Sequence, residues 1–259
     1  MSYVVDPASG VHQFVSDRNL ARQYDFIHTS FMVYQFAGGQ PIDHEFICTL
    51  NAYATRYLSP QPGQYRRHYD VEVGAHQPSP WPFVHHEMQD FLDVLHYNWA
   101  KWSAVELAAY ALWGVNHIHP FCDGNGRTAR ALSYYILCIK LQKWLPGDLT
   151  VVEQLRTNHR SHHCEILQRM HNARQRPEMK TDLGEMAALI DRLALEQVQA
   201  AAAAKQAAAE LAEREQATAT TSIQLAPDVI QFFRSEGNSW QLEINEILRR
   251  WAASQRPKG

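Results

Sequence analysis

The sequence has few cysteines and no long apolar run, and both absences limit the class of protein. Its four cysteines, Cys48, Cys122, Cys138 and Cys164, are scattered without a CxxC pair. This spacing excludes a zinc-finger pattern and a disulfide framework, so we expect reduced thiols in a cytoplasmic protein. No stretch approaches the roughly 20 apolar residues that span a bilayer, and the first residues lack the basic and apolar segments of a signal peptide. We therefore expect neither membrane insertion nor cleavage of a leader.

An excess of charge is also absent. Lysine and arginine number 24 against 27 for aspartate and glutamate, and the formal net charge is -3. Such a balance gives no overall electrostatic attraction to nucleic acid or to an anionic membrane, so a partner of that kind must meet a local patch. Hydrophobic residues make up 46% of the chain, which is ordinary for a globular protein and excludes global disorder.

Composition divides the 259 residues into three parts. Residues 186–217 hold neither glycine nor proline and consist mainly of strong helix formers, which predicts one long helix. Its first third carries Leu189, Ile190 and Leu193, which we expect to pack on the preceding domain. We therefore predict a domain at 1–180, an Ala-rich helical linker at 181–217 and a small module at 218–259.

Apolar periodicity in the first 180 residues is mostly that of helices. A stripe from Met88 to Trp99 recurs at helical spacing, and Ser103 with Glu106 has the spacing of a capping box that opens a second helix. A third apolar helix is expected to continue until Pro146. The fold class that follows is mainly α.

One β element is expected in this domain. Tyr69, Val71 and Val73 alternate with acidic residues, which is the pattern of a short strand. The predicted architecture is thus a helical core with one small β element, a long helical linker and a small C-terminal module.

Between two predicted helices lies the segment HPFCDGNGRTAR, residues 119–130. Its GNG turn falls where a helix begins, so free backbone N–H groups and the positive end of the helix dipole converge there, and glycine lets a phosphate approach the backbone. Arg127 and Arg130 are three residues apart in the first turns of that helix, and each offers a fork of donors to phosphate oxygens. This nest of N–H groups with two arginines predicts a site for more than one phosphate.

Two further side chains of the segment have catalytic chemistry. Asp123 precedes the turn, where a hard carboxylate oxygen can hold the Mg2+ that accompanies a nucleotide polyphosphate. His119 ends the preceding helix, and imidazole is the side chain whose pKa best suits proton abstraction near neutral pH. Phe121, between them, is interpreted as an anchor in the core.

Each of these features has a simpler interpretation when taken alone. The histidine can be structural, the GNG turn an ordinary turn, the arginines a solvated face, and Asp123 a helix N-cap. Their placement together within twelve residues favours the catalytic interpretation.

The segment matches HxFx(D/E)GNGRxxR at every specified position and resembles the signature of the Fic family. The resemblance implies a compact helical Fic fold and transfer of AMP from ATP, with Mg2+, to a Ser, Thr or Tyr hydroxyl of a target protein. It also implies a general base at His119, a metal ligand at Asp123, and catalytic or nucleotide-binding roles for Gly124, Asn125, Gly126, Arg127 and Arg130. Two other activities within the family stay open, namely phosphoryl transfer and removal of AMP.

Residues 63–74 resemble the hairpin flap that lies over a Fic active site. In that interpretation Tyr69, Val71 and Val73 would dock the target segment. His163 is a candidate for the adenine side of the site, where family members often carry a tyrosine pair.

Residues Thr181 to Glu185 are the closest candidate for the inhibitory (S/T)xxxE(G/N) helix that restrains many Fic proteins. Met186 departs from that pattern. An ordinary helix start capped by Thr181 is the simpler interpretation.

The C-terminal module has a strand pattern followed by two helix patterns. Polar and apolar residues alternate from Thr220 to Leu225, Pro227 opens a helix that Gly237 ends, and Ser239 can cap another. This order is the ribbon-helix-helix plan, and the segment resembles the tail of BrnA-type antitoxins. Such modules form homodimers whose paired strands enter the DNA major groove, which makes candidate DNA contacts of Thr220, Ser222 and Gln224.

Charge argues against strong DNA binding by this module. Residues 218–259 carry five basic and four acidic side chains, so salt-dependent binding to phosphates would be weak. Dimerisation without DNA binding is therefore an equal alternative. A further alternative makes the tail the main function, as an antitoxin-like DNA-binding regulator in which the Fic unit senses a nucleotide.

Overall fold

The computed structural model describes residues 4–38, 42–74, 76–174, 182–218, 224–235 and 240–254. Two compact units make up the chain, Met1–Gln206 and Ala207–Gly259. The domain boundaries that we predicted from composition, after residues 180 and 217, stay predictions. Among the described residues, no helix combines the length and the hydropathy that a membrane crossing needs.

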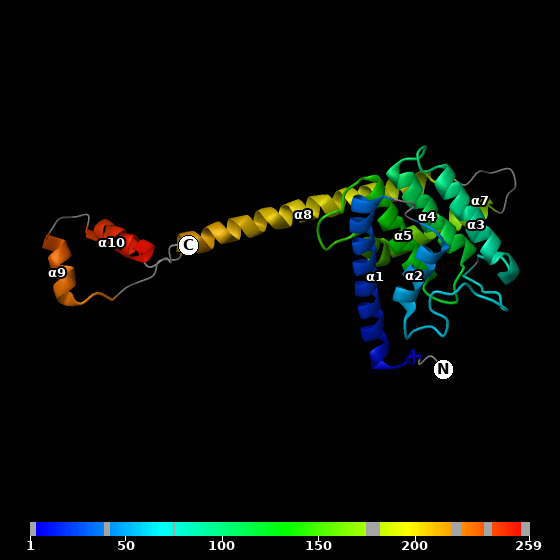
Figure 1. Ribbon diagram of the computed structural model, residues 1–259, viewed down its shortest axis with the longest axis horizontal. Helices are drawn as coiled ribbons and strands as arrows, with labels where there is room; N and C mark the ends of the chain where they lie inside the picture. The colour runs from blue at the N-terminus through cyan, green and yellow to red at the C-terminus, as the bar shows by residue number, and fades with distance from the viewer. Residues whose placement is uncertain are drawn as a thin grey trace. The chain divides into compact units, whose positions relative to one another are not determined.

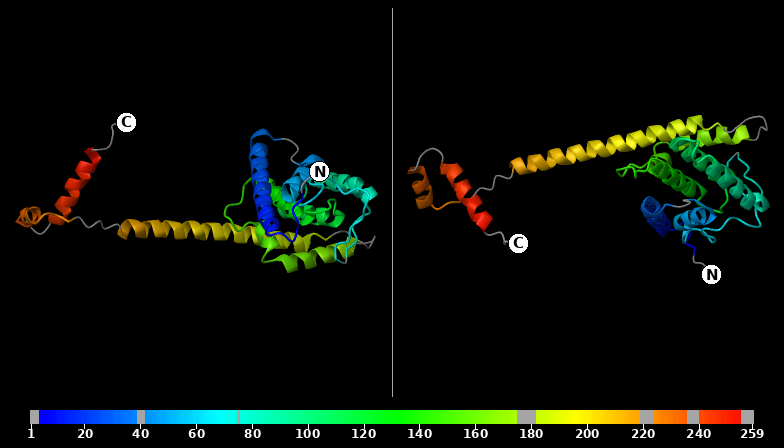
Figure 2. Two further views of the ribbon diagram at one scale, coloured as in Figure 1. Left: turned by 90° about the horizontal axis from the view of Figure 1, so that it is seen from below. Right: turned by 45° about the horizontal axis from the view of Figure 1, so that its top comes forward.

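The first unit is helical, as predicted, and α5 lies at its centre (Figures 1 and 2). Helix α5 packs against α1, α2, α4 and α6, while α4 also contacts α3 and α7. The elements are α1 (Gly10–Ala37), α2 (His44–Thr55), the 3-10 helix η1 (Trp81–Phe83), α3 (Val84–Tyr97), α4 (Ala104–Ile118), α5 (Asn125–Lys140), α6 (Val151–Arg156), α7 (Arg160–Arg174) and α8 (Gly184–Thr218).

The predicted helix signals are confirmed in α3 and α4. The buried face of α3 includes Met88 and Leu95 from the apolar stripe. The capping box at the start of α4 forms in both directions, because the Ser103 hydroxyl accepts from the Glu106 N–H and the Glu106 carboxylate accepts from the Ser103 N–H at 2.8 Å. The end of α4 therefore lies at a fixed place, next to His119.

Helix α5 ends at Lys140, well before the predicted stop at Pro146. Gln142 adopts a left-handed backbone with φ of 51°, its N–H donates to the Ile139 carbonyl, and the Lys143 N–H donates to the Cys138 carbonyl. These two bonds make a Schellman motif, which satisfies the last carbonyls of the helix. Glycine is the usual residue at that position, so the glutamine gave no signal in the sequence.

The strand predicted at residues 69–73 and the hairpin flap expected at 63–74 are not confirmed, since the described residues of this segment contain isolated bridges in place of strands. Tyr65 pairs with Phe121, and Val73 pairs with His76. The alternating acidic side chain of Asp70 accepts from the Trp81 N–H at 2.7 Å. The segment is therefore tied locally to its surroundings and has no neighbouring strand with which to form a ladder.

The first turns of α8 are part of the core of the first unit. Leu189, Ile190 and Leu193 are buried, as predicted for this third of the helix. Gln197 is also buried, and its amide group donates to the Tyr134 hydroxyl and to the carbonyls of residues 145 and 146, while its oxygen accepts from the Val151 N–H at 3.0 Å. One polar side chain thus fixes α8 against the loop that follows α5.

Replacing Gln197 with alanine is expected to lower the free energy of unfolding by about 2 to 3 kcal/mol. The variant leaves buried donors and acceptors without their partner, and such groups are costly in an interior. Urea denaturation followed by circular dichroism measures the change. Gln199→Ala on the exposed side of the same helix is the matched control, and equal midpoints for the two variants would contradict the role of Gln197.

The second unit contains α9 (Pro227–Ser235) and α10 (Trp240–Ser254). Thr220 and Ser222 lie outside the described residues. Gln224 is exposed and belongs to no helix or strand. The two predicted helices are confirmed, whereas the strand of the ribbon-helix-helix plan stays a prediction.

Candidate functional site

Two residues in the loop between α4 and α5 have a left-handed backbone conformation, which lets the chain reverse between the two helices. His119 caps the end of α4 with φ of 53°, and Gly124 precedes α5 with φ of 78°. A Cβ atom on Gly124 would lie 2.3 Å from the Thr55 side chain, so both the backbone and the space require glycine. The glycine thereby brings the start of α5 close to α2.

Two asparagines hold this loop in place. Asn125 is buried, and its side chain accepts from the Phe121 N–H at 2.9 Å and donates to the Phe121 carbonyl at 2.8 Å. From α2, Asn51 donates to the Asp123 carbonyl at 2.9 Å and to the Thr128 hydroxyl at 3.2 Å. The Asn125 side chain therefore stabilises the loop, while the role of this residue in binding phosphates stays a prediction. Phe121 is fully buried, as expected of the predicted anchor.

Arg66 is a positioning residue that the sequence did not reveal. It is 1% exposed, and its guanidinium donates to the carbonyls of His119 at 2.8 Å, Ile118 at 3.3 Å and Ser79. Its own backbone N–H donates to the Pro120 carbonyl at 2.8 Å. One buried cation thus joins the flap segment to the end of α4 and to the loop that carries His119. The flap segment consists of the predicted flap at 63–74 together with the residues up to 79.

His119 has the protonation state of a base at neutral pH. Burial is the main reason that the pKa of His119 falls from 6.5 to about 4. The hydrogen bond to the Asn116 carbonyl raises this pKa, and the nearby Arg66 charge lowers it. The Nδ1 atom lies 3.4 Å from that carbonyl. With the proton on Nδ1, the Nε2 atom keeps a lone pair that can accept a proton.

A cleft with a volume of about 590 Å³ lies over this loop, and its lining is rich in arginine. His119, Gly126, Arg127 and Arg130 from the motif all line it. Arg156 at the end of α6 and Arg160 at the start of α7, which the motif did not predict, also line it. No aspartate or glutamate is among the described residues of the lining. Arg127 pairs with Asp123 and Arg156 pairs with Glu153, yet the four guanidinium groups still give the cleft an excess of positive charge, which suits a polyanion.

Among the described residues that line the cleft, three buried polar atoms have no hydrogen-bond partner, namely Arg130 Nε, His163 Nε2 and His76 Nδ1. Burial and the neighbouring arginines lower the pKa of Arg130 to about 10, so it still carries its charge at neutral pH. Buried polar groups normally have partners, and those left without one indicate a place for a ligand. A nucleotide polyphosphate offers the acceptors that Arg130 lacks.

Asp123 has the chemistry of a Mg2+ ligand. Its side chain is 48% exposed, one oxygen accepts from the Gly124 N–H at 2.6 Å, and the other pairs with Arg127 at 2.7 Å. Each carboxylate oxygen has a second lone pair, and Mg2+ is commonly held by one carboxylate together with substrate phosphates. The residues therefore fit the ion that the family resemblance implies.

Comparison with known proteins agrees with this geometry. The family model described as Fic/DOC family matches residues 41–137, which contain the flap segment, the motif loop and most of α5. Residues 41–137 thus carry the match to the Fic/DOC family that the motif predicted. A second family model, the BrnA antitoxin of type II toxin-antitoxin systems, matches residues 191–252.

The relatives of this Fic domain share its sequence over short stretches only. The chain is 41% identical over 76 residues to "Protein adenylyltransferase Fic" of Drosophila willistoni and 39% identical over 79 residues to the protein of the same name from Drosophila persimilis. Each match covers 29% of this chain, and the chain spans about 15% of the length of these curated relatives.

Solved structures share the Fic fold. Fic-1 (residues 134–508) from C. elegans superposes with a TM-score of 0.61 at 21% identity, covering 79% of this chain and 56% of that one. A Fic domain containing signaling protein from Bacteroides thetaiotaomicron gives a TM-score of 0.54 at 18% identity, over 75% of this chain and 72% of that one.

Of the candidate residues outside the motif, some line the same cleft as the motif and others do not. His163 on α7 and Val73 line the same cleft as His119, whereas Tyr69 and Val71 are not among the lining residues. Thr181 lies outside the described residues. Glu185, at the other end of that predicted inhibitory segment, forms a two-bond ion pair with Arg169 on α7, at 2.9 and 3.1 Å, and does not pair with the motif arginines.

Acid is expected to destabilise the Fic domain in part through His163. Burial and then the charge of Arg130 lower the pKa of His163 from 6.5 to about 4. Between these two values the unfolded chain binds a proton at this position that the folded chain does not, so the free energy of unfolding falls as pH drops from 6.5 to 4. His163→Leu removes this contribution.

Urea unfolding at a series of pH values measures the effect. The wild type is expected to lose on the order of 3 kcal/mol more than His163→Leu between pH 7 and 4. His162→Leu, on the same helix with an exposed side chain, is the matched control. If the free energy of unfolding changes with pH equally in the wild type and in His163→Leu, His163 has the same pKa in the folded and the unfolded chain, and the prediction is wrong.

Proposed function

We propose that the chain is a protein adenylyltransferase, which transfers AMP from ATP to a Ser, Thr or Tyr hydroxyl of a target protein and releases pyrophosphate. The observation that carries this proposal is the cleft itself, where a neutral, partly buried histidine lies in the same lining as four arginines and the start of α5. The names of the Drosophila relatives support the same activity.

In this mechanism the target hydroxyl attacks the α-phosphorus of ATP. A bond forms between the hydroxyl oxygen and phosphorus, the bond from phosphorus to the bridging oxygen breaks, and the hydroxyl proton goes to Nε2 of His119. Arg127 and Arg130 hold the outer phosphates in line, and the backbone N–H groups at the start of α5 face the developing charge. Pyrophosphate leaves with its negative charge matched by the arginines.

Bound with ATP, Mg2+ would neutralise part of the phosphate charge, and Asp123 is the residue that would hold it. Arg127 donates to Asp123 at 2.7 Å and to the Ala54 carbonyl at 2.8 Å, so its guanidinium is oriented before ATP binds. Such orientation reduces the entropy lost when the phosphates are bound.

ATP labelled at either the α or the γ phosphate tests the proposal. The full-length protein is incubated with Mg2+, labelled ATP and a cell extract as the source of targets. Label on protein from the α position alone supports AMP transfer. Label from the γ position alone replaces it with phosphoryl transfer, and no label from either position contradicts both.

For the C-terminal unit we propose a dimerising module that pairs two copies of the chain. The match to the BrnA antitoxin supports it, as do the exposed apolar side chains of α10, where Leu242 is 73% and Ile247 is 54% exposed. Sedimentation equilibrium of the full chain tests the dimer, and Leu242→Lys is expected to shift it toward monomer. DNA binding by the module is a separate outcome, measured by a gel shift with the promoter region of its own gene.

A further inference from the structure

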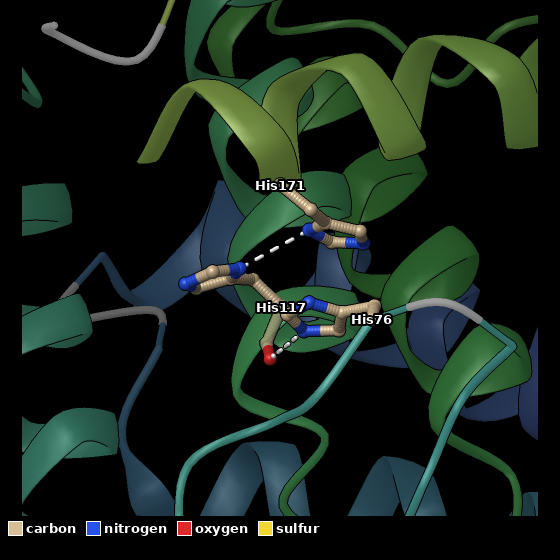
Figure 3. A group of neighbouring side chains, drawn as sticks. All are labelled: His76, His117 and His171. Carbon is tan, nitrogen blue, oxygen red and sulfur yellow. Dashed lines mark hydrogen bonds between the residues drawn. The ribbon is translucent and has the colours of Figure 1, made fainter. Parts of the chain in front are cut away.

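Three histidines outside the motif converge beside the cleft (Figure 3). His76 comes from the flap segment, His117 from the last turn of α4 and His171 from α7, and one ligand atom from each lies within 4.8 Å of the others. His76 and His171 are 2% and 5% exposed. Segments far apart in the sequence thus place three imidazoles in one buried space.

Two of the nitrogens already have the spacing of metal ligands. His117 Nδ1 lies 3.1 Å from His171 Nδ1. Zinc binds imidazole nitrogen at about 2.0 to 2.1 Å, so two ligands of a tetrahedral ion lie about 3.3 Å apart. The distance between the two nitrogens therefore already suits one ion, although the rings, which lie 27° from parallel, would have to turn their lone pairs toward it.

His76 has the hydrogen bond that is typical of a metal-binding histidine. Its Nε2–H donates to the backbone carbonyl of His117 at 2.8 Å, as the dashed line in Figure 3 shows. Metal-binding histidines commonly donate their second ring N–H to a carbonyl or carboxylate, which fixes the tautomer and leaves the lone pair on the other nitrogen. That other nitrogen, Nδ1 of His76, is buried and has no hydrogen-bond partner.

We infer that His76, His117 and His171 form a site for one Zn2+ ion, which joins the flap segment to α4 and α7. Three neutral imidazoles are a common zinc ligand set and leave a fourth position for water. Mg2+ prefers oxygen ligands, so this site is chemically distinct from Asp123. The rings of His76 and His171 are stacked with centroids 3.9 Å apart, and ion binding would turn them toward a common point.

The expected consequence is a more rigid flap segment. His76 follows Val73 and Gly74, which line the cleft, and the backbone pairs Val73 with His76 in both directions at 3.0 and 3.1 Å. An ion at His76 therefore fixes the residues that border the cleft next to His119. The inference does not depend on whether the protein transfers AMP.

Zinc titration of the chelator-treated full-length protein tests the site. Isothermal calorimetry is expected to give one Zn2+ per chain, and Co2+ in its place is expected to give the intense visible absorption of a tetrahedral site with nitrogen ligands. His171→Gln should weaken Zn2+ binding by more than the roughly 10- to 100-fold that loss of an outer hydrogen-bond partner costs. His162→Gln, exposed on the same helix, is the matched control.

Two further measurements keep the test decisive if one variant folds poorly. At a Zn2+ concentration about 100-fold above Kd, the melting temperature of the wild type should rise by about 5 °C or more, and hydrogen exchange in residues 69–79 should slow. Circular dichroism identifies any variant that has unfolded. Absence of stoichiometric binding to the wild type overturns the inference, as does unchanged affinity in folded variants at all three histidines.

Discussion

Replacing His119 with asparagine is expected to slow AMP transfer by about 10³-fold, because the step loses its general base. The choice of asparagine matters, since residue 119 has a left-handed backbone with φ of 53° and asparagine tolerates that conformation better than alanine does. Within the part of the chain that the structure describes, the imidazole makes one hydrogen bond, the 3.4 Å contact to the Asn116 carbonyl. Little stability is therefore lost with it.

The rate of α-label transfer at saturating ATP measures the change, and the free energy of unfolding should stay within about 1 kcal/mol of the wild type. His86→Asn is the matched control, because the His86 side chain is exposed on α3 and faces Asp90 at 3.6 Å on the same helix. Transfer that continues at the wild-type rate in the asparagine variant would rule out His119 as the base. A variant that unfolds would say nothing about catalysis, which is why both quantities are measured on one preparation.

The sequence predicted the parts of this site that are close together along the chain. A capping box, a histidine at a helix end and a glycine-rich turn are local features, and local backbone physics decides them. His119, Arg127 and Arg130 line one cleft, in agreement with the motif. The role of Asn125 as a nucleotide contact stays a prediction, because the same residue type also suits a loop that needs both a donor and an acceptor.

The missed residues are those whose role depends on tertiary packing. Arg66 looks like a surface arginine next to Arg67 in the sequence, yet only one of the two is buried. Arg156 and Arg160 enter the cleft because α6 packs against α5 and α7 packs against α4, which no periodicity within either helix indicates. The strand predicted at residues 69–73 is not found for a related reason. Alternation indicates an extended, half-exposed segment, but a strand also needs a neighbouring strand, and none pairs with these residues in the described part of the chain.

The largest stability effect is expected for Arg66→Met, which should lower the free energy of unfolding by about 4 kcal/mol. Methionine keeps much of the volume of the aliphatic stem but none of the donors. The carbonyls of Ser79, Ile118 and His119 then lose a charged donor while they stay away from water. Since a whole domain is stable by only about 5 to 15 kcal/mol, this loss is a large fraction of the total.

The neighbouring arginine supplies the matched control. Arg67→Met makes the same chemical change one residue further on, at an exposed side chain, and should alter the free energy of unfolding by less than about 0.5 kcal/mol. Arg66→Lys keeps the charge but offers one ammonium in place of a planar fork, so it should fall between Arg66→Met and the wild type. Urea denaturation of the three variants gives this order directly. If Arg66→Met and Arg67→Met unfold at the same urea concentration, Arg66 does not hold the flap segment to the loop of His119, and the alignment of the base must come from the asparagines alone.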